Sequence, residues 1–344
     1  MKNIKKLALL LTVIGLTGAL LAGCGTAPAD SEDRGEGETY NFRLATVVSP
    51  PHPWTDMADY FAEEVERRTE GNVTIRVYHS GSLGDDETTI DEMRLGTIDF
   101  VLGGVANATA FLPEYQITGF SYLFEDMDHF KRVVSPDSPV LKHFQQLHED
   151  RDIPLKLLAL AGGGTRVTST NFGPVSRPDS LKGINIRLPG NPLEVKIWEA
   201  FGALPTTLPW GDIYSSMQSG LVQGFESTIS GYYGSKLYEV APHQSMTNHQ
   251  IMISHFTMSK AAYDKLPPEY REVIEEVAIE AGILGTEKGE EYDQTLQAEM
   301  VEKYGVEVYE VDMDAFAEIV IPMHDELAAG IGLTELLQMI RDLR

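Results

Sequence analysis

Cysteine is almost absent from this chain of 344 residues, in which Cys24 is the one thiol. A single cysteine excludes an intrachain disulfide, and it also excludes a metal centre built from several thiolates. We predict no metal site and no cofactor.

The chain also lacks the short motifs of the common enzyme classes. It has no nucleophile elbow, Walker loop, dinucleotide fingerprint or paired-histidine zinc motif, so no catalytic residue is predicted. Gly162–Gly164 lacks the lysine that would follow in a phosphate loop. We interpret this run as a tight strand exit, because glycine adopts positive φ at no steric cost. His243, His249 and His255 are six residues apart, which fits neither a helix face nor a usual metal spacing, and we interpret them as surface or loop residues.

Basic residues are scarce. The chain has 27 Lys and Arg against 52 Asp and Glu, which gives a net charge of −25. Such a charge disfavours nucleic acid and anionic lipid surfaces as partners. If the protein binds an anion, it needs a local cluster of positive charge.

The N-terminus has the organisation of an export signal. Lys2, Lys5 and Lys6 precede an apolar run over 7–21, which is too short to cross a bilayer comfortably. The run ends in Leu-Ala-Gly-Cys at Cys24, which resembles the lipobox of bacterial lipoproteins. We expect residues 1–23 to be removed and Cys24 to carry lipid outside the cytoplasm. The alternative is an ordinary signal peptide with an accidental cysteine.

The residues after Cys24 are small, polar and acidic, and they show no apolar periodicity. We interpret residues 24–39 as a disordered tether between lipid and folded domain. The composition from residue 40 onward is that of a globular protein, and the length suffices for two domains.

Strand and helix patterns alternate along the globular part, which indicates the α/β class with a largely parallel sheet. A long helix is expected from Pro267, with apolar residues on one face and acids on the other, and the C-terminal region is expected to be mostly helical. Strands are predicted over 41–48, 73–78, 98–102, 155–160, 184–188, 221–225, 250–257 and 306–311.

Two arginines lie at predicted strand ends. Arg166 follows the glycine run, and Arg187 lies near the end of its strand, before Pro189. Ligands of parallel α/β sheets bind beyond the carboxyl ends of the strands. A planar guanidinium there can hold a carboxylate through two charge-assisted hydrogen bonds. The alternative for each arginine is an ion pair with a neighbouring acid.

Ten short stretches, in order along the chain, carry a family resemblance. The chain resembles the solute-binding proteins of TRAP (tripartite ATP-independent periplasmic) transporters, of the DctP-like family. The match covers about 41–316. The stretches are 61–65 with 71–73, 83–86, 96–100, 120–124, 164–166, 181–189, 209–214, 224–227, 236–240 and 247–249.

The resemblance implies a receptor that catches an organic acid outside the cytoplasm and delivers it to a membrane permease. Its fold would be periplasmic-binding-protein-like, with two α/β domains joined by hinge strands and a long spanning helix. We expect domain I over 40–163 plus 252–291. Domain II is expected over 164–251 plus 292–344, with the C-terminal helices.

The resemblance also assigns ligand-binding residues. Arg187 occupies the position that anchors the substrate carboxylate, Arg166 is a second pocket cation, and Trp210 walls the pocket. Many relatives have Gln-Glu-Asn after the next strand, with the Asn on the carboxylate. Here the stretch is Phe225-Glu226-Ser227, and the shorter Ser227 carries a single hydroxyl.

The remaining pocket residues are inferred from their places in loops and at helix starts. His52, Asp86 and Asn107 could bind ligand hydroxyls, although Asp86 could equally be a helix N-terminal acid. This polar set suits a uronate or an aldonate better than a plain dicarboxylate. Gly103-Gly104 stands where the sialic-acid receptors of the family have a glutamate, so sialic acid is not expected.

Two other functions stay open at this point. One is an extracytoplasmic hydrolase of acidic sugars, with Glu226 and Asp86 as the acid and base. The other is a sensor lipoprotein that presents its bound ligand to a receptor.

Overall fold

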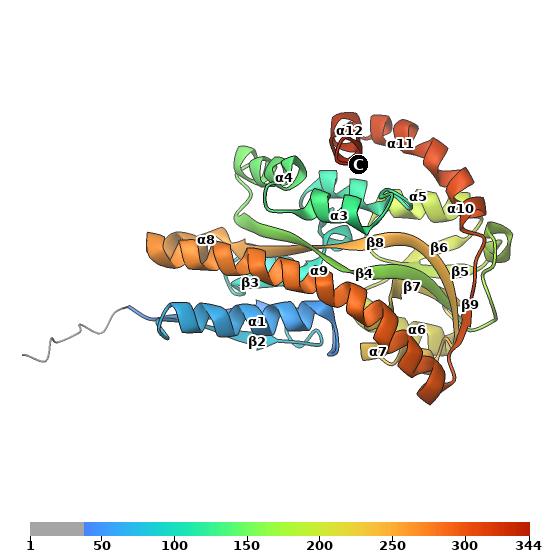
Figure 1. The fold of residues 1–344 in the computed structure, drawn as a ribbon, viewed down its shortest axis with the longest axis horizontal. Coiled ribbons are helices and arrows are strands. Elements are labelled where there is room, and N and C mark those ends of the chain that lie inside the picture. Colours follow the sequence, from blue (N-terminus) through green and yellow to red (C-terminus); the bar gives the residue numbers. More distant parts are fainter. Residues whose placement is uncertain (1–37) are drawn as a thin grey trace, which may run out of the picture. The chain divides into compact units, whose positions relative to one another are not determined.

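The computed structural model describes residues 38–344, and Cys24, the signal segment and most of the tether lie outside them. These residues form one mixed sheet with helices on both sides (Figure 1). The strands are β1 (Tyr40–Ala45), β2 (Val73–Tyr78), β3 (Phe100–Gly104), β4 (Leu155–Thr170), β5 (Asn185–Leu188), β6 (Leu204–Thr207), β7 (Gly224–Thr228), β8 (His243–Ser259) and β9 (Glu307–Tyr309). The helices are α1 (Pro53–Arg68), α2 (Asp86–Arg94), α3 (Met127–Val134), α4 (Pro139–Asp150), α5 (Pro192–Ala200), α6 (Ile213–Ser219), α7 (Ile229–Gly234), α8 (Lys260–Lys265), α9 (Pro268–Tyr304), α10 (Met313–Val320), α11 (His324–Gly330) and α12 (Thr334–Arg341).

Two long strands join the halves of the sheet. The strand order is β2-β1-β3-β8-β4-β7-β5-β6, and β9 adds to β8. The outer groups are parallel, with β1 beside β2 and β3, and β5 beside β6 and β7. In contrast, β4 and β8 are antiparallel to each other, and they bring the two parallel groups into one sheet.

The glycine run 162–164 does not end a strand, which corrects the sequence-based interpretation. Strand β4 continues through it to Thr170, with a shift of register against β8 between Gly162 and Thr165. Gly164 has a φ of +103°. A Cβ on Gly289 of α9 would lie 2.7 Å from the backbone nitrogen of Gly164. The glycines therefore allow the helix to cross the strand at close range.

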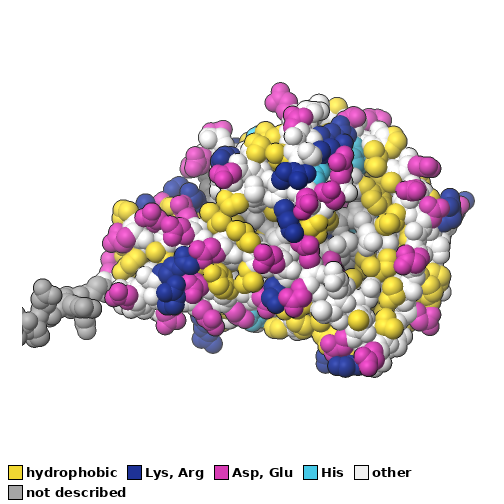
Figure 2. All heavy atoms as spheres, viewed as in Figure 1, with side chains coloured by type: hydrophobic (Ala, Val, Ile, Leu, Met, Phe, Trp, Pro, Cys, Tyr) yellow, Lys and Arg dark blue, Asp and Glu magenta, His cyan; other side chains and the backbone are white. Residues whose placement is uncertain are grey.

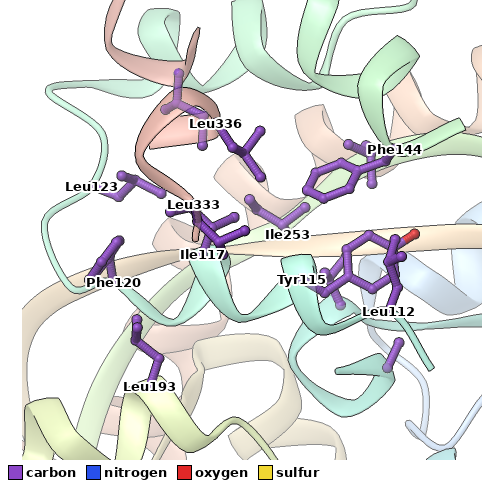
Figure 3. Close-up of a cluster of buried hydrophobic side chains, with 14 of the residues drawn as sticks. Leu112, Tyr115, Ile117, Phe120, Leu123, Phe144, Leu193, Ile253, Leu333 and Leu336 are labelled. Carbon is purple, nitrogen blue, oxygen red and sulfur yellow. The ribbon is translucent and has the colours of Figure 1, made fainter. Parts of the chain in front are cut away.

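Helix α9 packs on β4 and spans both halves of the sheet. It contacts α1 along one part of its length and α7 along another (Figure 1). Apolar cores lie on both sides of the sheet. The C-terminal helices close one core, where Leu333 and Leu336 pack near Ile117 and Leu123 (Figure 3).

Acidic side chains are spread over the face drawn in Figure 2, with Lys and Arg interspersed singly or in small groups. Among the described residues, no helix has both the length and the apolarity needed to cross a membrane.

Candidate functional site

A cavity that is partly open to solvent lies where the two halves of the sheet meet. Six of the nine residues predicted from the sequence to bind ligand line it. These are His52, Asp86, Asn107, Arg166, Arg187 and Trp210. The topology thus brings together side chains that are up to 158 positions apart in sequence (Trp210 minus His52).

Arg166 lies in β4, lines the cavity and forms an ion pair with an acid. Its Nε and Nη2 donate to the two carboxylate oxygens of Glu226 on β7, and both side chains are buried. Burial alone would raise the pKa of Glu226, but the Arg166 guanidinium and the nearby His249 hold that pKa below its ordinary value. Because Arg166 already has a bidentate carboxylate, most of its charge is compensated inside the protein.

Among the described residues Arg187, unlike Arg166, has no carboxylate partner of its own. It lies on β5, one residue before the strand ends, and only 2% of its surface is exposed. Its Nε donates to the carbonyl of Leu208 at 2.9 Å, and it forms no ion pair within residues 38–344. Burial lowers the pKa of Arg187 to about 10, with Glu226 opposing, so the group stays protonated at neutral pH. A buried cation without a carboxylate partner is unfavourable unless an anion joins it.

Trp210 forms one wall beside Arg187. The guanidinium carbon lies 5.8 Å from the centre of the Trp210 ring, which is within cation–π range. The indole Nε1 donates to Ser235 Oγ at 3.2 Å, which fixes the ring. Gly231 gives the ring room, because a Cβ there would lie 3.1 Å from it. A flat apolar surface next to a cation suits a sugar ring that carries a carboxylate.

Asp86 and Asn107 form a polar pair on the cavity wall. Asp86 is the first residue of α2, and Asn107 Nδ2 donates to its Oδ2 at 2.9 Å. Asn107 Oδ1 accepts from the backbone nitrogen of Gly190 at 3.4 Å, in the loop after β5. Burial raises the pKa of Asp86 to about 7, against the pull of Arg187. The pair can accept hydrogen bonds from hydroxyl groups of a ligand and can donate hydrogen bonds to them.

His52 and Trp54 occupy the start of α1. His52 caps the helix, since its Nδ1 accepts from the backbone nitrogen of Trp54 at 3.1 Å. Burial lowers the pKa of His52 to about 3, so its ring is neutral. Trp54 lines the cavity and donates through Nε1 to Ser254 Oγ. Gly104 lies under this tryptophan, where a Cβ would come within 3.5 Å of the ring.

Three residues that were predicted to bind ligand do not line the cavity. Phe225 is wholly buried in a core cluster. Glu226 is held by Arg166, and the hydroxyl of Ser227 donates to the carbonyl of Thr228 at 3.1 Å. The cause is that β7 extends over this stretch, whereas the sequence pattern ends the strand at Phe225. Thr228, the last residue of β7, reaches the cavity instead.

The interpretation of the three spaced histidines as surface or loop residues is wrong. All three lie in β8, where His249 and His255 are buried and His243 is partly buried. His249 Nε2 lies 3.5 Å from Glu226 Oε2, so it supports the acid that holds Arg166. No group of three His, Cys, Asp or Glu in residues 38–344 has the arrangement of a metal site.

Sequence reasoning missed several residues of the site. Gln250 lines the cavity from β8, and its Nε2 donates to the carbonyl of Thr118. Glu194 is buried close enough to both arginines to interact with them, and it is not among the residues that line the cavity. No local motif marks either residue, because their positions depend on long-range pairing of β4, β5 and β8.

Comparisons with known proteins show which family this chain resembles. The family described as bacterial extracellular solute-binding protein, family 7 (DctP), matches residues 44–330. A solute-binding protein of Sulfitobacter sp. (strain NAS-14.1) is 31% identical over 328 residues, which are 94% of this chain and 98% of that protein.

Two solved structures are similar over nearly the whole described part. One is a TRAP periplasmic solute-binding protein of Chromohalobacter salexigens with bound D-glucuronate, which is 28% identical with a TM-score of 0.81, covering 88% of this chain and 100% of that one. The other, from Bradyrhizobium sp. in complex with galacturonate, is 26% identical with a TM-score of 0.81, covering 88% and 99%. These matches confirm the predicted fold class, a two-domain α/β fold of the periplasmic-binding type.

Proposed function

This chain belongs to the DctP family of bacterial extracellular solute-binding proteins, and from that premise we propose which solute it captures. The solute is a hydroxylated carboxylate, such as a uronate or an aldonate. The protein binds it outside the cytoplasm and delivers it to a TRAP-type permease in the membrane.

The observation that carries the proposal is the buried, uncompensated guanidinium of Arg187 at the cavity. A ligand carboxylate there would accept two charge-assisted hydrogen bonds, each contributing about 1.5–3 kcal/mol in a sheltered site. It would also neutralise a charge that no acid of residues 38–344 pairs with directly. Trp210 offers the adjoining apolar surface for the carbon skeleton.

The far wall supports the hydroxylated class. Asp86, Asn107 and Gln250 present carboxyl and amide groups that can exchange hydrogen bonds with several hydroxyls. A plain dicarboxylate would bring its second charge toward Asp86, which opposes it. The relatives with bound D-glucuronate and galacturonate support the same class.

The hydrolase alternative gains no support from the geometry. Its acid–base pair required Glu226 and Asp86 to face one substrate. Glu226 is 0% exposed, bound on both oxygens by Arg166, and absent from the cavity lining. Asp86 would be left without a second carboxyl group.

A thermal-shift panel tests the proposed ligand class. D-Glucuronate, D-galacturonate and D-gluconate are expected to raise the melting temperature by several degrees, because a ligand at 100 times its Kd stabilises the folded state by about 2.7 kcal/mol. D-Glucose, which lacks the carboxylate, and succinate, which lacks the hydroxyls, are the matched controls. Stabilisation by succinate alone, or by glucose as strongly as by glucuronate, would contradict the proposal.

We also propose that Cys24 anchors the protein to the membrane through lipid. The support is the Leu-Ala-Gly-Cys sequence at the end of the apolar run, since Cys24 lies outside the described residues. Such an anchor would keep the receptor close to its permease.

Replacing Cys24 by serine is expected to move the protein from the membrane fraction to the soluble fraction. Serine keeps the size of the side chain but offers no thiol for the lipid. The measurement is immunoblotting of the fractionated cells, with the unaltered chain as control. A Cys24→Ser protein that stays with the membranes would show that another element holds it there.

We further propose that the two domains, 40–163 with 252–291 and 164–251 with 292–344, close on the ligand. The support is that two features lie near their boundaries. The β4–β8 register shifts between the pairs Gly162–Ile253 and Thr165–Ile251. Helix α9 crosses β4 at Gly289, next to Gly164. Bending at these points needs little repacking, because glycine has no side chain to displace.

A further inference from the structure

Glu194 is a buried acid that the proposed function does not use. It is the third residue of α5, where Asn191 provides the cap by accepting from the backbone nitrogens of Leu193 and Glu194. Glu194 is only 1% exposed, and no N–H or hydroxyl group of the described residues donates to its carboxyl oxygens, although its carboxyl group lies within hydrogen-bonding reach of the Glu226 carboxylate. Burying a carboxylate in this way is costly unless it is paired or protonated.

The charged groups that act most strongly on Glu194 within residues 38–344 are the two arginines of the cavity and Glu226, the partner of Arg166. Arg166 comes from β4, Arg187 from β5 and Glu226 from β7, and His249 of β8 stands behind Glu226 at 3.5 Å. Burial raises the pKa of Glu194 to about 8, and repulsion from Glu226 adds to the rise. The two arginines and the N-terminus of α5 favour the ionised form, but they are outweighed.

Further unpartnered polar atoms lie in the same place. Trp198 is one helical turn beyond Glu194, and its Nε1 is buried without a hydrogen-bond partner in the described structure. The Trp198 ring stands perpendicular to that of His249, with 5.3 Å between the ring centres. His249 Nε2 also lacks a hydrogen bond of good geometry. This region is therefore polar, tightly enclosed and connected to Glu226.

The charge of Glu194 decides the charge balance of the site. With Glu194 neutral, Arg166 and Arg187 exceed the single carboxylate of Glu226 by one positive charge, and ionisation of Asp86 on the cavity wall reduces this excess. With Glu194 ionised, the acids cancel the arginines and no excess remains. Interactions between buried charges are strong because the surroundings screen them weakly.

We propose that Glu194 determines the charge of the ligand: as a neutral acid near the two arginines, it leaves them with one positive charge in excess over Glu226, which one ligand carboxylate neutralises. This inference rests on the proposed function, because it concerns the same site. Glu194 would not touch the ligand. It would affect which ligands bind by changing the charge that the two arginines present to them. A monoanion is favoured over a dianion, and its binding is linked to the proton on Glu194.

The first test is the affinity for D-glucuronate at different pH, measured by calorimetry on the mature protein. In the wild type we expect Kd to rise about tenfold between about pH 7 and about pH 9, as expected for linkage to one proton with a pKa near 8. In Glu194→Gln, which cannot ionise, the rise should shrink to about twofold or less. Asp86 also titrates near this range, but it is present in both proteins. Its effect therefore cancels when the Kd of the wild type is divided by the Kd of Glu194→Gln at each pH.

Glu199→Gln is the matched control. It removes a carboxyl group from the same helix at an exposed position, and it should keep the wild-type pH profile. If Glu194→Gln also kept that profile, Glu194 would not be the linked group and the inference would be overturned.

Melting temperatures measured without ligand at different pH separate this inference from the proposed function. A group whose pKa is raised in the folded state stabilises the protein below its unfolded pKa, and this stability is lost as pH rises through the folded value. For Glu194 the window runs from its ordinary pKa of 4.5 to about 8. The melting temperature of Glu194→Gln minus that of the wild type should therefore increase across this window and then level off.

A melting-temperature difference that stays constant across the window would overturn the inference, whatever the ligand proves to be. If the difference increases as expected but no sugar acid binds at any pH, the proposed ligand class fails while the protonation of Glu194 stands.

Discussion

Replacing Arg187 by methionine is expected to weaken binding of the ligand carboxylate by about thirtyfold to several-thousandfold. Truncating one partner of a buried, hydrogen-bonded charge pair costs about 2–5 kcal/mol. Methionine keeps much of the side-chain volume beside Trp210, so the loss would report the guanidinium rather than an opened void. Calorimetric titration with D-glucuronate measures the effect.

Two further variants sharpen this result. Arg187→Lys keeps the positive charge but loses the planar fork, and it should fall between the wild type and Arg187→Met. Arg177→Met is the matched control, because Arg177 is exposed and pairs with Asp312 far from the cavity lining. Binding by Arg187→Met at wild-type strength would remove Arg187 from the site.

Replacing Glu226 by glutamine is expected to destabilise the fold by about 3–5 kcal/mol, because it leaves the buried Arg166 without its carboxylate. The loss of stability should be large, since Arg187 also repels the guanidinium of Arg166 once Glu226 no longer pairs with it. Urea unfolding of the ligand-free protein measures it. The slope of the unfolding free energy against urea should stay the same, which would show that the native state keeps its compactness.

An exposed ion pair provides the control for that comparison. Arg151 holds Glu114 through both terminal nitrogens, but 43% of the arginine side chain is exposed. Glu114→Gln should therefore cost no more than about 1 kcal/mol. Equal losses from Glu226→Gln and Glu114→Gln would mean that burial adds nothing to the Arg166–Glu226 pair.

Much of the fold could be predicted from the sequence, because local patterns report local structure. The alternating run over 73–78 coincides with β2, and the helix expected from Pro267 is α9. The glycine run 162–164 was misread because a positive φ looks the same in a turn and in an irregular strand. The deciding contact is with Gly289, which is distant in sequence.

The extent of the long strands was underestimated for the same reason. β8 begins at His243, well before its apolar part, because pairing with β4 and β9 supplies hydrogen bonds to a polar stretch. A polar segment in the middle of a sheet cannot be recognised from its own residues. The buried His249 and Gln250 on that strand were missed for this reason.

The site was predictable where it rests on arginines, and less so elsewhere. Arg166 and Arg187 were both singled out by their places near predicted strand ends, and both line the cavity, although Arg166 also forms the ion pair that was the alternative. Glu226 was assigned to the ligand, but the structure gives its oxygens to Arg166. Glu194 has the sequence signature of an ordinary helix N-terminal acid. Its importance comes from burial against partners on three strands.

The most direct test of the central claim is the position of the ligand carboxylate in a crystal structure of the mature protein grown with D-glucuronate. We expect both carboxylate oxygens to accept hydrogen bonds from the guanidinium of Arg187, with the sugar ring against Trp210. Its hydroxyls should then face Asp86 and Asn107. A sugar acid bound with its carboxylate away from Arg187 would contradict the account. A ligand that displaced Arg166 and itself formed hydrogen bonds with Glu226 would contradict it as well.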